Sequence, residues 1–119
     1  MGKEGFKSLE VWPEAKRLAV EIYQLTEHGK FLKDYGLRDQ IRRAAVSVAS
    51  NIAEGDERNT DKEAVHFFYI AKGSIAEIRT QLQIAQEIGY LDNVRYEKLD
   101  EEYKILGKRI GRLIVTRMN

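Results

Sequence analysis

Apolar side chains recur along this chain at alternating intervals of three and four residues, a spacing that few structures other than packed helices can satisfy. The longest run is Phe68, Ala71, Ile75, Ile78, Leu82 and Ala85. Because an α-helix completes a turn about every 3.6 residues, residues spaced in this way form one apolar stripe, or seam, on one helix face. Such a helix gains most of its stability from burying its seam against other helices.

Three further segments carry the same pattern, so the sequence predicts four helices, at about 11–28, 37–54, 61–88 and 93–118. The seams of the other three are Ala15, Leu18, Ile22 and Leu25; Leu37, Ile41, Ala45, Val48 and Ile52; and Tyr96, Leu99, Tyr103, Leu106, Ile110 and Leu113. Their connections are short, which favours antiparallel neighbours. We therefore predict an all-α fold, an antiparallel up-down-up-down four-helix bundle formed by a single domain over residues 1–119.

Residues typical of helix ends support these boundaries. Thr60, followed three residues later by a glutamate, forms a capping-box pattern, and Asp92 is a candidate N-cap. Gly29, Gly55 and Gly89 are predicted to end the first, second and third helices, because glycine adopts a left-handed backbone at little cost.

Composition excludes several classes of protein. The chain has 119 residues and no cysteine, which excludes disulfide scaffolds and cysteine-ligated metal sites. It contains no apolar run of the about 18 residues that cross a membrane, and residues 1–5 lack the apolar core of a signal peptide. We expect a cytoplasmic protein whose residues 1–10 form an extended arm, with Phe6 and Leu9 available for docking.

The third predicted helix carries more apolar surface than one seam can bury. Four consecutive large apolar residues, 67–70, cover most of the helix circumference at about 100° per residue. Ile70, Ile84 and Ile88 form a second stripe beside the seam. Either a loop or the N-terminal arm covers this surface, or it is a subunit interface, as contiguous exposed apolar surface usually is. The second interpretation is favoured, and the predicted interface residues are Phe67, Tyr69, Ile70, Glu77 and Gln81.

The second predicted helix has a polar stripe at the border of its apolar face, formed by Gln40, Arg43, Ser47, Asn51 and Glu54. A solvated face explains charged residues well, but it explains serine and asparagine less well. The alternatives are a partly buried hydrogen-bond network that fixes helix register or a subunit contact, and a ligand-binding groove. We predict the network or contact for Arg43, Ser47, Asn51 and Glu54.

The strongest charge feature lies near the C-terminus, where no acidic residue follows Glu102. The cations that follow are Lys104, Lys108, Arg109, Arg112 and Arg117, although the formal net charge of the chain is only +1. Cations near a helix C-terminus interact favourably with the helix dipole, and a charged outer face keeps a bundle soluble. The functional alternative is a basic strip that binds a nucleic-acid backbone. Its candidate contacts are Arg38, Arg42, Lys104, Lys108, Arg109 and Arg112.

Catalytic and metal-binding patterns are weak. The spacing Glu63-x-x-His66 matches di-iron carboxylate bundles, but such a site needs a second copy, and the sequence has none. Ser47 and Ser74 fall inside predicted helices, without the turn that exposes a nucleophilic serine. We therefore expect no catalytic residues, no metal and no cofactor.

Two paired signatures resemble a known family. They are Gly36-Leu37-x-x-Gln40-x-Arg42-Arg43-Ala44-x-x-Ser47 with Asn51-Ile52-Ala53-Glu54-Gly55, and Phe67-x-x-Ile70-Ala71-x-Gly73-Ser74-x-x-Glu77 with Thr80-Gln81-Leu82. Over about residues 6–115, the chain resembles the bacterial four-helix-bundle proteins encoded in intervening sequences of large-subunit ribosomal RNA genes. This family, also called ribosomal-protein-like, includes the accessory protein of diversity-generating retroelements.

The resemblance implies a four-helix bundle that assembles into a homopentameric barrel and has no catalytic activity. For retroelement-type members it also implies binding of nucleic acid and of the reverse transcriptase through a strongly basic surface, from which this near-neutral chain departs. The first hypothesis is a homo-oligomeric scaffold that contacts RNA, DNA or a nucleic-acid enzyme through basic outer faces. The second is a protein-interaction or structural module without affinity for nucleic acid. Neither hypothesis involves a membrane or a metal.

Overall fold

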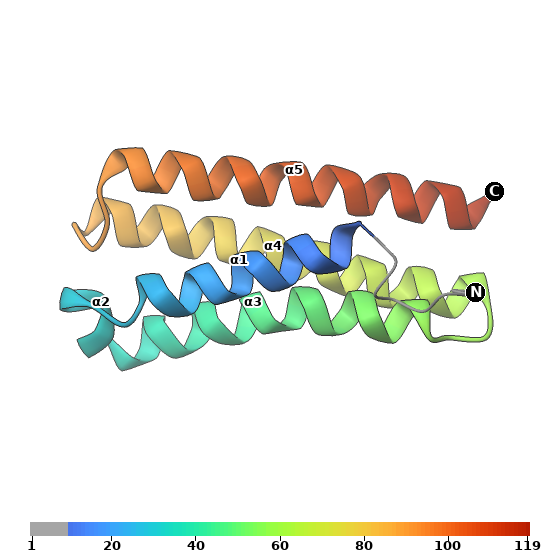
Figure 1. Ribbon diagram of the computed structural model, residues 1–119, viewed down its shortest axis with the longest axis horizontal. Coiled ribbons are helices and arrows are strands. Elements are labelled where there is room, and N and C mark those ends of the chain that lie inside the picture. Colours follow the sequence, from blue (N-terminus) through green and yellow to red (C-terminus); the bar gives the residue numbers. More distant parts are fainter. Residues whose placement is uncertain (1–9) are drawn as a thin grey trace.

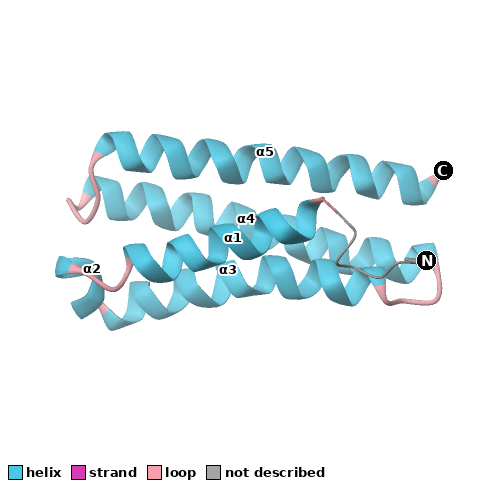
Figure 2. Ribbon diagram, in the orientation of Figure 1, coloured by secondary structure: helices cyan, strands magenta, loops and turns pink. Residues whose placement is uncertain are grey.

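Helices account for 86% of the residues that the computed structural model describes, which are residues 10–119, and no strand occurs among them. The helices are α1 (Val11–Leu25), α2 (Gly29–Lys33), α3 (Tyr35–Asp56), α4 (Asp61–Glu87) and α5 (Asn93–Met118). The four long helices lie side by side and alternate in direction, as Figure 1 and Figure 2 show. The molecule is a rod of 44 × 20 × 19 Å.

Each long helix packs mainly on its neighbours in the chain. Helix α3 packs against α1 on one side and α4 on the other, and α4 also packs against α5, whereas α1 and α5 share a much smaller contact. Helices α3 and α5 therefore lie diagonally across the bundle, with α1 and α4 between them (Figure 1). The predicted antiparallel order of the four long helices is what the structure has.

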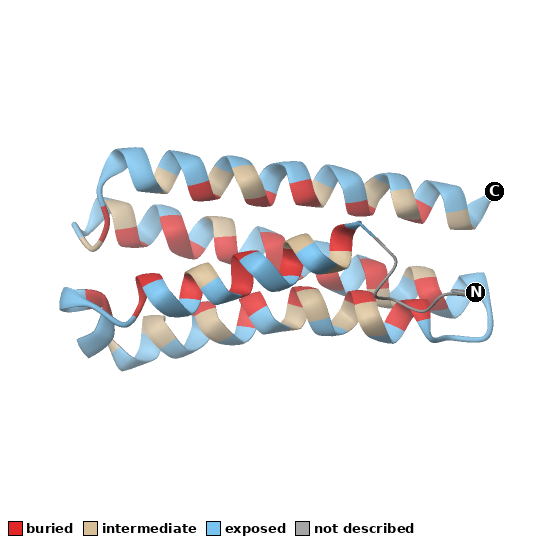
Figure 3. Cartoon of the chain, in the orientation of Figure 1, coloured by how far each residue is buried: buried red, intermediate tan, exposed pale blue. Residues whose placement is uncertain are grey.

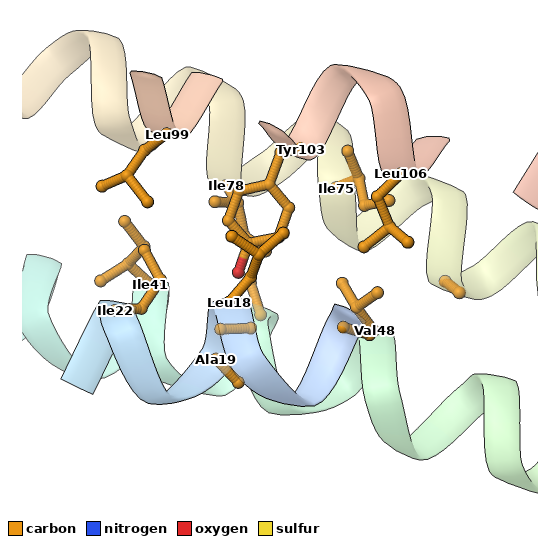
Figure 4. Close-up of a cluster of buried hydrophobic side chains, with 14 of the residues drawn as sticks. Leu18, Ala19, Ile22, Ile41, Val48, Ile75, Ile78, Leu99, Tyr103 and Leu106 are labelled. Atoms are coloured by element: carbon orange, nitrogen blue, oxygen red, sulfur yellow. The ribbon is translucent and has the colours of Figure 1, made fainter. Parts of the chain in front are cut away.

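The predicted seams form the core. All six seam residues of α4 are buried, and the seams of α1, α3 and α5 are buried except at half-buried Leu37, Tyr96 and Leu113. Figure 3 shows the buried positions turned toward the bundle axis. Tyr103 is fully buried in the same cluster of core side chains as Leu18 and Ile78 (Figure 4), and burial raises the pKa of its phenol. Its hydroxyl has no hydrogen-bond partner among the described atoms.

Several predicted helix ends are confirmed. The hydroxyl of Thr60 accepts from the backbone N–H of Glu63 at 3.2 Å, and the Asp92 carboxylate accepts from the N–H of Arg95 at 2.7 Å. Gly89 has a φ of +87° just after α4, and the N–H of Tyr90 donates to a carbonyl five residues back, as in a Schellman motif. The predicted start of α5 is also correct.

The predicted end of the first helix and the predicted connection after it are wrong. The first helix ends at Leu25 rather than near His28, and the stretch expected to be a connection contains the one-turn helix α2. Gly29 has the predicted positive φ, +60°, but it opens α2 instead of ending α1. The physical reason is Phe31, which is buried and lies 5.4 Å from the ring of Tyr90, so α2 closes this end of the core.

Gly55 does not end α3, because the helix continues through Asp56. Glycine is needed there for packing: a Cβ atom on Gly55 would lie 2.6 Å from the ring of Phe68 and 3.0 Å from the carbonyl oxygen of Ala64. The first residues of α4 thus approach the backbone of α3 more closely than any side chain at position 55 would allow. The predicted arm, with Phe6 and Leu9, lies almost wholly in residues 1–9, outside the described residues.

We expect Gly55→Ala to lower the free energy of unfolding by about 1–3 kcal/mol, the usual cost of an overpacked core, despite the higher helix propensity of alanine. Urea denaturation measures this change. Gly107→Ala is the matched control, because a Cβ atom there would meet its nearest neighbour at 3.8 Å. The control should raise stability by up to about 1 kcal/mol. Equal effects of the two substitutions would contradict the packing argument.

Candidate binding surfaces

The outer face of α4 exposes large apolar side chains. Tyr69 is 55% exposed, Ile70 40%, Ile84 46% and Ile88 51%, whereas their neighbour Phe68 is fully buried. The prediction that one seam cannot bury residues 67–70 is therefore confirmed. Phe67 is half-buried, because the Arg58 guanidinium lies over its ring at 4.5 Å. We call Tyr69, Ile70, Ile84 and Ile88 the α4 apolar row.

A hydrogen-bond network joins α3 to α4. The Ser74 hydroxyl donates to the Ser47 hydroxyl at 2.9 Å, and the Asn51 side-chain amide donates to the same Ser47 oxygen at 2.9 Å. Ser74 is buried, while Ser47 and Asn51 are half-buried. The predicted network is therefore confirmed for Ser47 and Asn51. Because it ties two helices together, it fixes their register.

The two charged members of the predicted stripe lie outside this network. Glu54 accepts at 3.0 Å from Arg58, a residue in the loop just after α3. Arg43 is exposed and makes no ion pair with any described residue, Glu77 included. Arg43 and Glu77 instead line the same hollow of about 450 Å³ between α3 and α4, above Ser47 and Ser74.

Gln81 is a correction to the predicted interface, because it is only 9% exposed within the single chain. Positions 74 and 81 are seven residues apart and share one face of α4. Since Ser74 contacts α3, Gln81 also faces α3, and its side-chain carbonyl has no hydrogen-bond partner among residues 10–119.

The cations of α5 that were predicted to form a basic strip are exposed, and within the described chain none of them pairs with a carboxylate. We call Lys104, Lys108, Arg109 and Arg112 the basic strip. Other arginines are paired: Arg17 lies 2.6 Å from Glu102, and Arg79 lies 2.8 Å from Asp100, which raises the pKa of Arg79. The strip therefore carries charge that the fold itself does not use.

The basic strip borders two hollows on either side of α5. Arg109 and Arg112 line one of about 500 Å³ between α5 and the start of α1. Glu14 on α1 has a lowered pKa, chiefly because Arg17 donates to it and to a small extent because Arg109 is near. Lys104 and Lys108 line the other hollow, of about 330 Å³, between α5 and α4.

Arg38 and Arg42 do not extend the basic strip, which corrects that part of the prediction. The Arg42 guanidinium donates to the Thr26 hydroxyl at 2.7 Å and lies over the ring of Tyr23 at 4.6 Å. Arg38 pairs with Asp39 at 3.0 Å. Both belong to α3, diagonally across from α5; Arg42 contacts the end of α1, whereas Arg38 donates to the backbone carbonyl of Leu32 in α2.

Arg117, the last cation of the C-terminal run, also has a structural role. Its guanidinium donates to the buried carboxylate of Asp56 at 3.0 Å, lies 3.6 Å from Asp61, and lies over the ring of Phe68 at 5.5 Å. It therefore joins the end of α5 to the ends of α3 and α4. No spacing in the sequence signals this contact, since Arg117 and Asp56 are 61 residues apart.

The described residues hold no group of three or more histidines, aspartates or glutamates placed to bind a metal ion. His66 contacts the ring of Phe67 edge-on at 5.3 Å. Across residues 10–119, no helix is both long enough and apolar enough to span a membrane.

The comparisons with known proteins agree with the predicted resemblance. The model of the 23S rRNA-intervening sequence protein family matches residues 7–112. The chain belongs to this family. A crystal structure of a protein of unknown function from the S23 ribosomal protein family of Bacteroides thetaiotaomicron has the same fold, with a TM-score of 0.81 and 20% identity. The alignment covers 87% of this chain and 97% of that one. No curated protein matches the chain.

Two residues that line the candidate surfaces of this intervening-sequence family member were not selected from the sequence. Ser74 completes the network with Ser47, and Lys72 lies beside the hollow that contains Lys104 and Lys108. Both come from α4, whereas their partners come from α3 and α5. Only the register between helices brings them together, and no spacing within one helix could have signalled it.

We expect Ser74→Ala to lower the free energy of unfolding by about 1 kcal/mol, because it removes a buried hydrogen bond between helices. Ser50→Ala on α3 is the control, since Ser50 is exposed and an exposed substitution usually changes stability by less than about 0.5 kcal/mol. Both variants gain the same helix propensity, so their difference in urea denaturation isolates the hydrogen bond. Identical midpoints would show that the network does not stabilise the bundle.

Proposed function

We propose that this chain is a non-catalytic, self-assembling helical scaffold that binds RNA by its phosphate backbone on the outer face of α5. One observation carries the proposal: Lys104, Lys108, Arg109 and Arg112 are exposed without a carboxylate partner in the described chain. Evenly distributed charge would serve solubility equally well. A run of unpaired cations along one helix is what backbone phosphates require.

Self-assembly is supported by the other outer face. The large side chains of the α4 apolar row are exposed to water, and Arg43 and Glu77 line the hollow between α3 and α4. Neither has an ion-pair partner within residues 10–119, so a second copy would supply one to each. The family resemblance favours five copies in a closed ring, which would repeat the basic strip around its circumference.

Binding of this kind would depend on the backbone rather than on base sequence. The basic strip lies on a regular helix surface, and no known base-reading motif accompanies it in the sequence. Affinity should therefore fall steeply with salt, because each neutralised phosphate releases counterions.

The second candidate function is a protein-interaction module without affinity for nucleic acid. The observation that favours it is the charge balance, 20 basic against 19 acidic residues, which gives no overall attraction to a polyanion. On this proposal the α4 apolar row and the hollow between α3 and α4 still assemble copies, and a protein partner replaces the RNA.

We expect Ile70→Glu to dissociate the assembly, because a charge buried without a partner at a packed contact costs about 3–5 kcal/mol. Light scattering should give the mass of one protomer, with unchanged helical circular dichroism. Val94→Glu is the control, since Val94 is 80% exposed on α5, outside the α4 apolar row, and should keep the wild-type mass. A wild-type protein that is itself monomeric would contradict the proposed assembly.

We expect the combined substitution of Lys104, Lys108, Arg109 and Arg112 by Glu to weaken RNA binding at least about 100-fold at low salt, while the assembly keeps its mass. Filter binding with labelled single-stranded RNA measures the loss. The charge-matched control replaces Lys30, Lys33, Lys62 and Lys98, four exposed lysines outside the strip, by Glu. Equal retention of RNA by the wild type and the strip variant would contradict RNA binding by the strip and favour the protein-interaction module.

A further inference from the structure

We infer that the hollow between α4 and α5 is a binding site for a phosphate group of RNA, held by Lys72, Lys104 and Lys108. This inference rests on the proposed RNA-binding function. It adds to that function a specific position for one phosphate and a residue from a second helix, Lys72 of α4. We call the hollow, with these three lysines, the phosphate groove.

The groove gathers cations and no anions. Its lining includes Lys72 and Arg79 from α4 and Lys104 and Lys108 from α5, with no acidic residue. Arg79 pairs with Asp100 at 2.8 Å, so the charge of Arg79 is already neutralised. The three lysines make no ion pair with any described residue. A concave surface with three unpaired ammonium groups favours a polyanion such as an RNA strand, in which every backbone phosphate carries one negative charge.

Gly107 lines the groove, and Gly111 lies one turn further along α5 beside Lys72; the fold does not require either residue to be so small. A Cβ atom on Gly107 would lie 3.8 Å from Ile75, and one on Gly111 would lie 3.5 Å from the Lys72 ammonium. Both are ordinary contacts, unlike the clash that a Cβ atom on Gly55 would cause. Glycine inside a helix is less stable than alanine, so helix packing alone gives no reason for this pair. At Gly107, which lines the groove with Lys104 and Lys108, the absence of a side chain leaves open space.

Phosphate suits this space better than a carboxylate does. The hollow of about 330 Å³ is open to the outside, so a chain can pass along it while one of its phosphates enters. Each backbone phosphate offers two non-bridging oxygens as acceptors, and the next phosphate of the strand lies close enough to reach another lysine, whereas a lone carboxylate brings a single charge. On the far side of α5, Arg109 and Arg112 line the other hollow, so a strand that crosses α5 would meet both halves of the basic strip.

The test compares Lys72→Glu with Lys62→Glu, two exposed lysines of α4 with the same charge change, of which only Lys72 lines the groove. Fluorescence anisotropy with a labelled single-stranded RNA of mixed sequence gives affinity over a salt series. Lys72→Glu should weaken binding about tenfold and reduce the slope of log affinity against log salt by about 0.7, the value for one lost phosphate contact. Lys62→Glu should change affinity less than about twofold, because salt screens distant charges. Equal effects would overturn the inference.

A second variant tests the open space at Gly107 without changing any charge. Gly107→Leu places an apolar side chain where the groove is open, beside Ile75. Its thermal midpoint should not fall, because leucine is a better helix former than glycine. Its affinity for RNA should fall several-fold. A stable variant with wild-type affinity would show that the hollow does not admit a phosphate.

Inorganic tripolyphosphate separates this inference from the proposed function. It should raise the thermal midpoint of the wild type and of Lys62→Glu, but not that of Lys72→Glu, because a ligand stabilises the fold that binds it. If the wild type responds in this way but binds no RNA, the phosphate site stands and the RNA function fails. If RNA binds without any difference between the two lysine variants, the RNA function stands and the groove is overturned.

Discussion

The packing of α3 against α4 is the interaction on which the rest of the structure depends. The buried Ser74 hydroxyl reaches the Ser47 hydroxyl across this contact, and Gly55 lets the ring of Phe68 lie against the α3 backbone. Helix α1 is then attached mainly through α3, and α5 mainly through α4. The small contact between α1 and α5 follows from this order, and it leaves the hollow beside Arg109 and Arg112 open.

Interactions within one helix were predictable from the sequence, whereas those between helices were not. The spacing of the α4 seam selected six buried residues correctly, because burial there depends only on the period of the helix. Helix α2 was missed because it forms where Phe31 meets Tyr90, a residue far along the chain. Gly55 was misassigned for the same reason: glycine is needed there because of Phe68, and α3 ends one residue later, at Asp56.

The candidate binding residues show the same contrast between features within one helix and contacts between helices. Charge and spacing found the basic strip, since its four cations share one helix and face water. Charge alone also selected Arg38 and Arg42, but Arg38 pairs with Asp39 and Arg42 donates to the hydroxyl of Thr26. Lys72 was not selected, because only the register of α4 against α5 brings it over Gly111. A cation is available to a ligand only when no carboxylate of the folded chain pairs with it. Which cations remain unpaired depends on how the helices pack.

The separation of the two outer faces explains how a nearly neutral chain would hold a polyanion. The α4 apolar row and the hollow with Arg43 involve α3 and α4, whereas the basic strip and the phosphate groove lie on or beside α5. Contact between copies through the first face would leave α5 directed outward in each copy. A closed ring would then repeat one strip at fixed spacing, and a strand that bound one strip would meet the next at high effective concentration. Several copies of one local basic strip, repeated by the symmetry of the ring, would thus attract RNA although the net charge of the chain is only +1.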